Sequence, residues 1–259
     1  LLMTKSIIRP LFLVDLDDTL FQTPRKMQQE AKHIATTDKH GQAMSYMNAT
    51  QLQFVEWLLA SADVVPVTAR SVEAYQRVHL PFKHGAICAH GAVILTPDNQ
   101  VDNTWHQYMA TTLAPYKARL LEVIDFLESI SAMQQQSLRT WVVEEGGMAI
   151  YALAKHNDRH DEVLADAQYE LLQSIDLTDF YCHRNGNNLA IIPKVLNKRY
   201  AVQEWLRREH LQHGTRPIIG LGDSVSDLGF LQLCDWWGTP QQGQLAQAII
   251  SKLQMEIGV

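Results

Sequence analysis

The stretch Leu11–Thr19, which reads LFLVDLDDT, is a short apolar run that ends abruptly in an acidic cluster. Such a run is typical of a strand buried on both faces of a parallel sheet. Because side chains alternate along an extended chain, Asp15 and Asp17 should project to the same side. Two carboxylates that close repel each other unless a cation neutralises them, and oxygen ligands of this kind suit Mg²⁺. The alternative is an ordinary turn and helix cap, which aspartate also favours.

Two further apolar runs end in the same way. Val64–Val67 runs into Thr68, and Ile218–Leu221 runs into a Gly-Asp segment that contains Asp223. Amphipathic helical patterns separate the three runs, at residues 50–60, 198–209 and 224–233. This alternation predicts an α/β fold, with a Rossmann-like parallel sheet and right-handed crossovers. The polar residues at the carboxyl ends of the strands should then meet at one edge of the sheet.

The middle of the chain has a different pattern. Helical segments at 115–131 and 161–174 each precede a pair of β-rich runs, with turn signals at Gly146-Gly147 and at 184–188. We therefore predict an inserted α+β domain over 96–189, within a discontinuous core domain formed by 1–95 and 190–259. The polar segment 23–48 is predicted to be a loop or a frayed helix. Trp236-Trp237 is predicted to be a buried strand, and an aromatic platform for a ligand is the alternative.

Composition narrows the functional classes. The 259 residues are 46% hydrophobic and 19% charged, which is ordinary for a chain that buries a core. A formal net charge of −6 disfavours nucleic-acid binding as the main role. No apolar run approaches the ~20 residues that span a bilayer. Three widely spaced cysteines, Cys88, Cys182 and Cys234, indicate free thiols in a reducing compartment. We expect a cytoplasmic protein that binds neither nucleic acid nor membrane.

The polar residues form an ordered set. It comprises D-x-D-x-T at residues 15–19, Thr68, Lys198 at a helix start, and G-D-x-x-x-D at residues 222–227. Each alone has an ordinary explanation, such as a chance strand end or a solvated surface lysine. Together they resemble the four motifs of the haloacid dehalogenase superfamily of phosphatases, over essentially the whole chain. The insert resembles its C2-type caps, as in sucrose-phosphate, trehalose-phosphate, mannosyl-phosphoglycerate and Cof-type sugar phosphatases.

The resemblance implies a role for each motif residue. Asp15 would attack phosphorus and become an aspartyl phosphate, and Asp17 would act as general acid and base. Thr68 and Lys198 would bind the phosphoryl oxygens, with Lys194 a competitor for the lysine role. Arg70, which follows the second motif, would bind substrate.

The same resemblance implies a Mg²⁺ site. Its ligands would be the carboxylates of Asp15 and Asp223 and the backbone carbonyl of Asp17. Asp227 would orient Lys198 or a metal-bound water. Ser226 stands where relatives often have Asn, which departs from the family pattern.

The expected function is Mg²⁺-dependent hydrolysis of a small phosphorylated metabolite, such as a sugar phosphate or a sugar-phosphoglycerate. The alternatives are a phosphotransferase or phosphomutase with the same chemistry, and a non-catalytic metabolite-binding protein with a vestigial site. Candidate specificity residues lie near hairpin ends of the insert: Lys155, His156, Arg184, Asn185 and Asn188. The remaining histidines are assigned no role, and the oligomeric state is not predicted.

Overall fold

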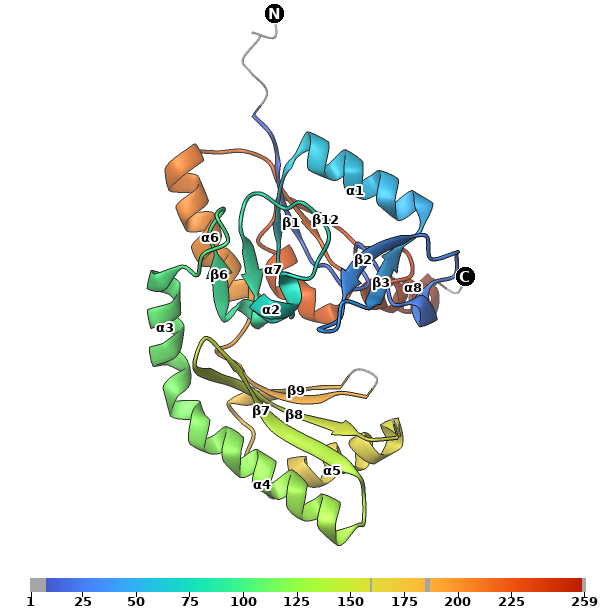
Figure 1. Ribbon diagram of the computed structural model, residues 1–259, viewed down its shortest axis with the longest axis vertical. Coiled ribbons are helices and arrows are strands. Elements are labelled where there is room, and N and C mark those ends of the chain that lie inside the picture. The colour runs from blue at the N-terminus through green and yellow to red at the C-terminus, as the bar shows by residue number, and fades with distance from the viewer. Residues whose placement is uncertain (1–7, 159, 185–186, 258–259) are drawn as a thin grey trace, which may run out of the picture. The chain divides into compact units, whose positions relative to one another are not determined.

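The protein is described by a computed structural model over residues 8–158, 160–184 and 187–257. These residues form two compact units (Figure 1). Unit 1 consists of the chain up to Asp102 and from Asn197 onward, and unit 2 is Asn103–Leu196. That each unit forms a separate domain, as the sequence suggests, stays a prediction. Among the described residues, none of the helices has the length and apolar character needed to cross a membrane.

Unit 1 contains a four-stranded parallel sheet in the order β12-β11-β1-β4. The strands are β1 (Leu11–Val14), β4 (Asp63–Pro66), β11 (Ile218–Leu221) and β12 (Trp236–Gly238). All four residues of β1 are buried, as expected for a central strand with both faces covered. Val14 pairs with Leu221 on one side and with Pro66 on the other, so three strands end at the same level. The predicted α/β fold with a parallel sheet is confirmed.

Two helices of unit 1 follow the predicted amphipathic patterns, α1 (Ala49–Ser61) and α6 (Lys198–His213). The others are α2 (Val72–Tyr75), α7 (Leu228–Leu231) and α8 (Gln244–Ile257), of which α2 and α8 were not predicted. Asn48 begins α1 with a capping box to Gln51. The helix predicted at 224–233 is instead a 3₁₀ turn, η4 (Val225–Asp227), followed by the short α7.

The expectation that residues 23–48 form a loop or a frayed helix is wrong. Residues 23–48 contain a 3₁₀ turn, η1 (Pro24–Lys26), and a β-hairpin of β2 (His33–Thr37) and β3 (Ala43–Met47). Asp38 accepts backbone N–H bonds from both His40 and Gln42 in the hairpin turn, so turn chemistry outweighs the weak strand pattern.

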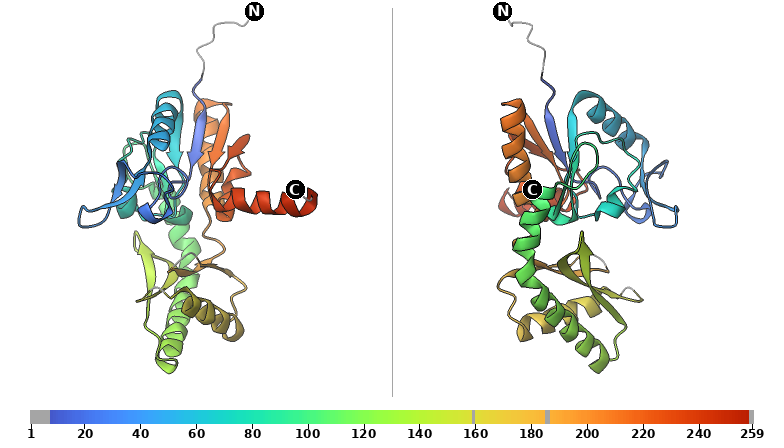
Figure 2. Two further views of the ribbon diagram at one scale, coloured as in Figure 1. Left: turned by 90° about the vertical axis from the view of Figure 1, so that its right-hand side faces the viewer. Right: turned by 60° about the vertical axis from the view of Figure 1, so that its left-hand side comes forward.

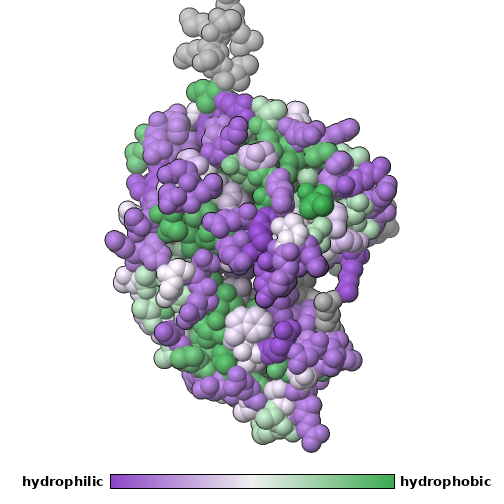
Figure 3. All heavy atoms as spheres, in the orientation of Figure 1, coloured by the Kyte–Doolittle hydropathy of each residue, from purple (hydrophilic) through white to green (hydrophobic). Residues whose placement is uncertain are grey.

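Trp236 and Trp237 form a strand, but they are 62% and 42% exposed instead of buried, because β12 is the edge of the sheet. A second small hairpin, β5 (Ala86–Cys88) and β6 (Val93–Leu95), is joined by η2 (Ala89–Gly91). On the face shown in Figure 3, hydrophilic side chains predominate and apolar ones lie among them in small patches.

Unit 2 is an antiparallel α+β unit with strand order β7-β8-β10-β9. Its strands are β7 (Leu138–Glu145), β8 (Met148–His156), β9 (Phe180–Arg184) and β10 (Leu189–Pro193). Its helices are α3 (Asn103–Leu113), η3 (Ala114–Tyr116), α4 (Lys117–Met133) and α5 (Asp161–Ser174). Gly146 and Gly147 have φ of 57° and 79°, which fits the predicted two-residue hairpin turn.

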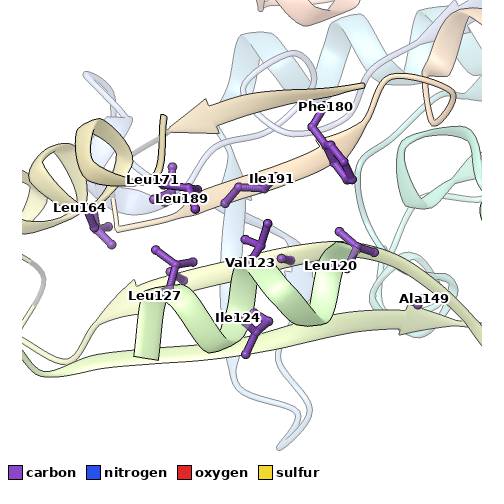
Figure 4. Close-up of a cluster of buried hydrophobic side chains, with 13 residues drawn as sticks. Leu120, Val123, Ile124, Leu127, Ala149, Leu164, Leu171, Phe180, Leu189 and Ile191 are labelled. Carbon is purple, nitrogen blue, oxygen red and sulfur yellow. The ribbon is translucent and has the colours of Figure 1, made fainter. Parts of the chain in front are cut away.

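The core of unit 2 lies between its sheet and the helices α4 and α5 (Figure 4). Leu120 and Leu127 from α4, Leu171 from α5 and Ile191 from β10 are all fully buried in it. The helix predicted for 115–131 therefore packs one apolar face against this sheet.

Candidate active site

Three acidic side chains meet at the carboxyl edge of the parallel sheet. Asp15 follows β1, Asp223 follows β11, and Asp227 ends η4. One carboxylate oxygen of each lies within 4.8 Å of one from the others, and all three residues are buried. The end-to-end alignment of β1 and β11 is what brings residues 15 and 223 together.

Lys198 lies within this acidic cluster. Its Nζ donates to Oδ1 of Asp15 and to Oδ1 of Asp227, each at 2.7 Å. Lys198 is the first residue of α6, where Asn197 caps the helix by accepting the N–H of Arg199. Lys194, the competitor for this position, instead donates to the carbonyl of Thr178 in unit 2.

Both carboxylate oxygens of Asp227 accept hydrogen bonds from the protein. Its Oδ2 accepts the backbone N–H of Ser224 at 3.0 Å and the Ser224 hydroxyl at 2.8 Å, while Oδ1 accepts from Lys198. A Cβ at Gly222 would lie 2.7 Å from Cβ of Asp227, so the loop requires glycine there. This arrangement suits a residue that orients Lys198.

The cluster has more negative than positive groups. Burial raises the pKa of Asp15 to about 8, with Asp227 adding to the effect of burial and Lys198 opposing it. Burial and Asp227 together raise the pKa of Asp223 to about 6. For Lys198, burial would lower the pKa, but Asp15 and Asp227 outweigh it and raise the pKa above its ordinary value. Three buried carboxylates against one ammonium make a donor set that fits a hard divalent cation.

Asp17 and Arg70 form a pair beside this cluster. Arg70 donates from Nε and Nη2 to the two carboxylate oxygens of Asp17, at 2.7 and 2.8 Å. The Arg70 side chain is only 9% exposed and lies over the ring of Phe21. Thr68 is buried, and its Oγ1 accepts the backbone N–H of Arg70 at 3.1 Å, which leaves its own hydroxyl proton for another acceptor. In this structure Arg70 therefore engages Asp17, the predicted acid.

Two contacts in the first motif were not anticipated from the sequence. The Thr19 hydroxyl lies 3.2 Å from Oδ2 of Asp15 and 3.4 Å from Oδ1 of Asp223, so it links the two. Thr19 was visible as part of the motif, but its partner is 204 residues away. Asp18, with a φ of 63°, turns away to an ion pair with Lys26.

In unit 2, His156, Asp158 and His160 also have potential ligand atoms within 4.8 Å of one another, although the sequence indicated no role for these histidines as metal ligands. Nδ1 of the buried His156 accepts backbone N–H bonds from Asp158 and His160, so the neutral ring carries its proton on Nε2. That tautomer has no free lone pair for a metal. Of the candidate specificity residues, Asn185 lies outside the described residues.

Comparisons with known proteins identify the fold. The sequence matches no protein-family model and no curated protein. Among solved structures, the chain is similar to the C-terminal domain of trehalose-6-phosphate phosphatase from C. albicans, with a TM-score of 0.55 and 14% identity over 86% of this chain and 73% of that one.

Two further structures extend the likeness over nearly the whole chain. The sucrose-phosphatase from Synechocystis, solved with sucrose and phosphate, has a TM-score of 0.53 and 16% identity, covering 95% of this chain and 98% of that one. A haloacid dehalogenase-like hydrolase from Bacteroides thetaiotaomicron has a TM-score of 0.50 and 13% identity, covering 94% and 99%. The predicted fold, a Rossmann-like core with an α+β insert as in this group of hydrolases, is confirmed.

Proposed function

We propose that this chain, which has the fold of the haloacid dehalogenase-like hydrolases, is a Mg²⁺-dependent phosphomonoester hydrolase acting on a small phosphorylated metabolite. The observation that carries the proposal is the convergence of Asp15, Asp223, Asp227 and Lys198 at one edge of the parallel sheet. A buried carboxylate beside a buried ammonium provides both a nucleophile and a binding group for a phosphoryl anion.

Asp15 is the proposed nucleophile. An oxygen of its carboxylate forms a bond to phosphorus as the bond to the alcohol oxygen breaks, which gives an aspartyl phosphate that water then hydrolyses. Lys198 contacts this carboxylate at 2.7 Å, so the same ammonium can bind a phosphoryl oxygen as the charge moves from Asp15 to the phosphoryl group. Thr68 would donate its hydroxyl proton to a second phosphoryl oxygen.

Asp17 is the proposed general acid and base. It would give a proton to the departing alcohol and later take one from the attacking water. Because both of its oxygens accept bonds from Arg70, Asp17 can deliver a proton only after this pair opens. We propose that the substrate attracts Arg70 and so releases Asp17, which combines the predicted substrate-binding role of Arg70 with its observed contact.

The cation would be held by the carboxylates of Asp15 and Asp223 and by the backbone carbonyl of Asp17. When bound, Mg²⁺ offsets the repulsion between an anionic nucleophile and an anionic substrate. Asp227 positions Lys198, and Thr19 keeps Asp15 and Asp223 in mutual orientation.

Sugar phosphates, including sugar-phosphoglycerates, are the substrate class we propose. The solved structures with this fold include phosphatases of trehalose 6-phosphate and of sucrose phosphate, which supports the class without selecting one compound.

The test is hydrolysis of a generic aryl phosphate and of a panel of phosphorylated metabolites, ranked by kcat/KM with and without Mg²⁺. We expect phosphate release that requires the cation and that is fastest with one sugar phosphate. Transfer of phosphate to an added alcohol in preference to water would identify a phosphotransferase instead. Binding of sugar phosphates with no release of phosphate would identify a non-catalytic binding protein.

A further inference from the structure

The turn between β5 and β6 has an unusual backbone. Its residues Ala89, His90 and Gly91 have φ values of 51°, 56° and 100°, and we call these three residues the left-handed turn. Only glycine adopts this region without steric cost, so the surrounding structure must hold Ala89 and His90 in it. Strained residues of this kind are concentrated at functional sites, where an exact geometry matters more than local stability.

One side of the left-handed turn is bonded to the segment that contains Thr68 and Arg70. The N–H of Ala89 donates to the carbonyl of Arg70 at 2.7 Å, and the N–H of His90 donates to the carbonyl of Thr68 at 3.2 Å. The N–H of Thr68 in turn donates to the carbonyl of Ile87 at 2.8 Å. Both backbone polar groups of Thr68 are therefore held by this part of the chain, which fixes the point from which its side chain starts.

The other side of the left-handed turn packs against the start of α6. A Cβ at Gly91 would lie 2.8 Å from the carbonyl oxygen of Asn197 and 3.3 Å from Cβ of Ala201, so only glycine fits there. Asn197 immediately precedes Lys198 and caps α6 through its side chain. The right view of Figure 2 shows α6, in orange, alongside the parallel sheet of unit 1. Gly91 therefore fixes how closely the first turn of this helix approaches the segment of Thr68.

We propose that the left-handed turn is a positioning element that sets the distance between the Thr68 hydroxyl and the Lys198 ammonium. The inference rests on the proposed function, in which these two groups bind phosphoryl oxygens. The hydrogen bonds of Ala89 and His90 and the close approach of Gly91 need the same backbone conformation, so a change of φ disturbs both sides of the turn together. Because catalysis depends on donors placed for the charge that develops on the phosphoryl oxygens, an error of about 1 Å in their placement can lower the rate on the order of a hundredfold.

The alternative is a turn that matters for stability alone. In that case substitutions would lower the free energy of unfolding and leave the phosphate affinity of the folded protein unchanged. A positioning role instead changes the affinity for phosphate and the value of kcat/KM, whichever way the stability moves. Binding of inorganic phosphate in the presence of Mg²⁺, measured by calorimetry, distinguishes the two roles without requiring turnover.

Gly91→Ala is the direct test. Its methyl group would push against the carbonyl oxygen of Asn197 and displace the start of α6. The dissociation constant for phosphate should therefore rise, and kcat/KM for an aryl phosphate should fall, each at least about tenfold. Gly214→Ala is the matched control, because Gly214 has a φ of 71° at the other end of α6 and nothing lies within 4 Å of a Cβ built there. Alanine at 214 meets a similar backbone cost without a contact, so both quantities should stay within about twofold of the wild type.

A second pair of variants tests the backbone conformation without a steric clash at α6. His90→Asn should keep the phosphate affinity within about twofold, because asparagine tolerates the left-handed region better than most residues with a side chain. His90→Val should raise the dissociation constant at least about fivefold, because a β-branched residue disfavours that region. Circular dichroism checks that each variant is folded, and if Gly91→Ala does not fold, the two His90 variants decide the question.

The outcomes separate this inference from the proposed function. A wild-type protein that hydrolyses phosphate esters, with equal phosphate affinity in Gly91→Ala and Gly214→Ala, would overturn the inference and leave the proposed function intact. Equal losses in His90→Asn and His90→Val would also overturn it, because they would assign the effect to the imidazole instead of the backbone. A wild-type protein that neither binds nor releases phosphate would overturn both.

Discussion

The two edges of the parallel sheet in unit 1 both bury charged side chains, but with opposite balance. At the carboxyl edge, Asp15, Asp223 and Asp227 surround the single ammonium of Lys198. At the amino edge, Arg216 lies between Asp63 and Glu209. Arg9 and the histidines His84 and His213 complete this second cluster.

The difference in charge balance between the two clusters is reflected in the pKa values of their acidic residues. Burial would raise the pKa of Asp63, but Arg216, His84 and Arg9 outweigh it and hold this pKa below its ordinary value. At the carboxyl edge the pKa of Asp223 rises to about 6. A cluster whose charges are matched within the protein stabilises the fold, whereas one with excess negative charge calls for a cation from outside. The comparison teaches that charge balance, and not burial alone, separates the proposed active site from a structural ion-pair network.

The largest expected effect is on activity at the carboxyl edge. Asp15→Asn removes the proposed nucleophile and should lower kcat/KM for the best substrate at least about a thousandfold. The matched variant Asp63→Asn, at the amino edge, should keep activity within about twofold. Steady-state kinetics on both variants measures the difference. Comparable losses in the two would erase the distinction between the edges.

The next effect is on stability at the amino edge. Arg216→Met leaves Asp63 and Glu209 partly buried without their shared cation, and should lower the free energy of unfolding by about 3 kcal/mol. Urea unfolding followed by circular dichroism measures it. Arg207→Ala is the control, because Arg207 is 60% exposed and pairs with Glu204 at the surface, so we expect a change below about 0.5 kcal/mol. A small effect of Arg216→Met would show that the network is not structural.

A smaller expected effect distinguishes the two edges of the sheet by the pH dependence of the free energy of unfolding. Because the pKa of Asp223 is raised from 3.8 to about 6, the folded protein binds more protons than the unfolded one between these values. With chelator present, Asp223 should therefore reduce the free energy of unfolding as pH rises from about 4 to about 6, by about 1–2 kcal/mol.

The measurement is the difference between wild type and Asp223→Asn across this pH range. Asp223→Asn should lack the fall, and added Mg²⁺ should oppose it in the wild type. Asp63 contributes the opposite sign, since its lowered pKa gives stability above its ordinary pKa that is lost as the pH falls through the lowered one. Identical pH profiles for wild type and Asp223→Asn would contradict the assignment.

The smallest expected effect is on stability, and it comes from the hydrogen bonds that Ser224 donates to Asp227. Ser224→Ala removes one of the two bonds to Oδ2 of Asp227 and the cap of η4, and should cost about 1 kcal/mol of stability. Thermal unfolding checks it. Ser226→Ala, which leaves both Ser224 bonds to Asp227 in place, should be close to neutral; an equal loss there would show that the Ser224 bond has no special weight.

Much of the fold could be predicted because its signals are local. The apolar run of β1, the glycine pair at the β7–β8 turn and the periodicity of α4 each act within one segment. The hairpin of β2 and β3 was missed because neither strand alternates regularly between apolar and polar residues. The exposure of Trp236 was missed because position at a sheet edge is a property of the whole sheet.

By itself, the sequence determined the order of β1, β4 and β11 along the chain, the αββαββ pattern of unit 2 and the polar residues that follow these three parallel strands. Only the tertiary structure decided that Lys198 and not Lys194 contacts Asp15, that Thr19 links Asp15 with Asp223, and that Arg70 holds Asp17. The physical reason is the sequence separation over which each kind of interaction acts. Backbone propensity and hydrophobic periodicity act over a few residues, whereas these contacts join residues 53 to 204 positions apart, and depend on strand register and side-chain direction.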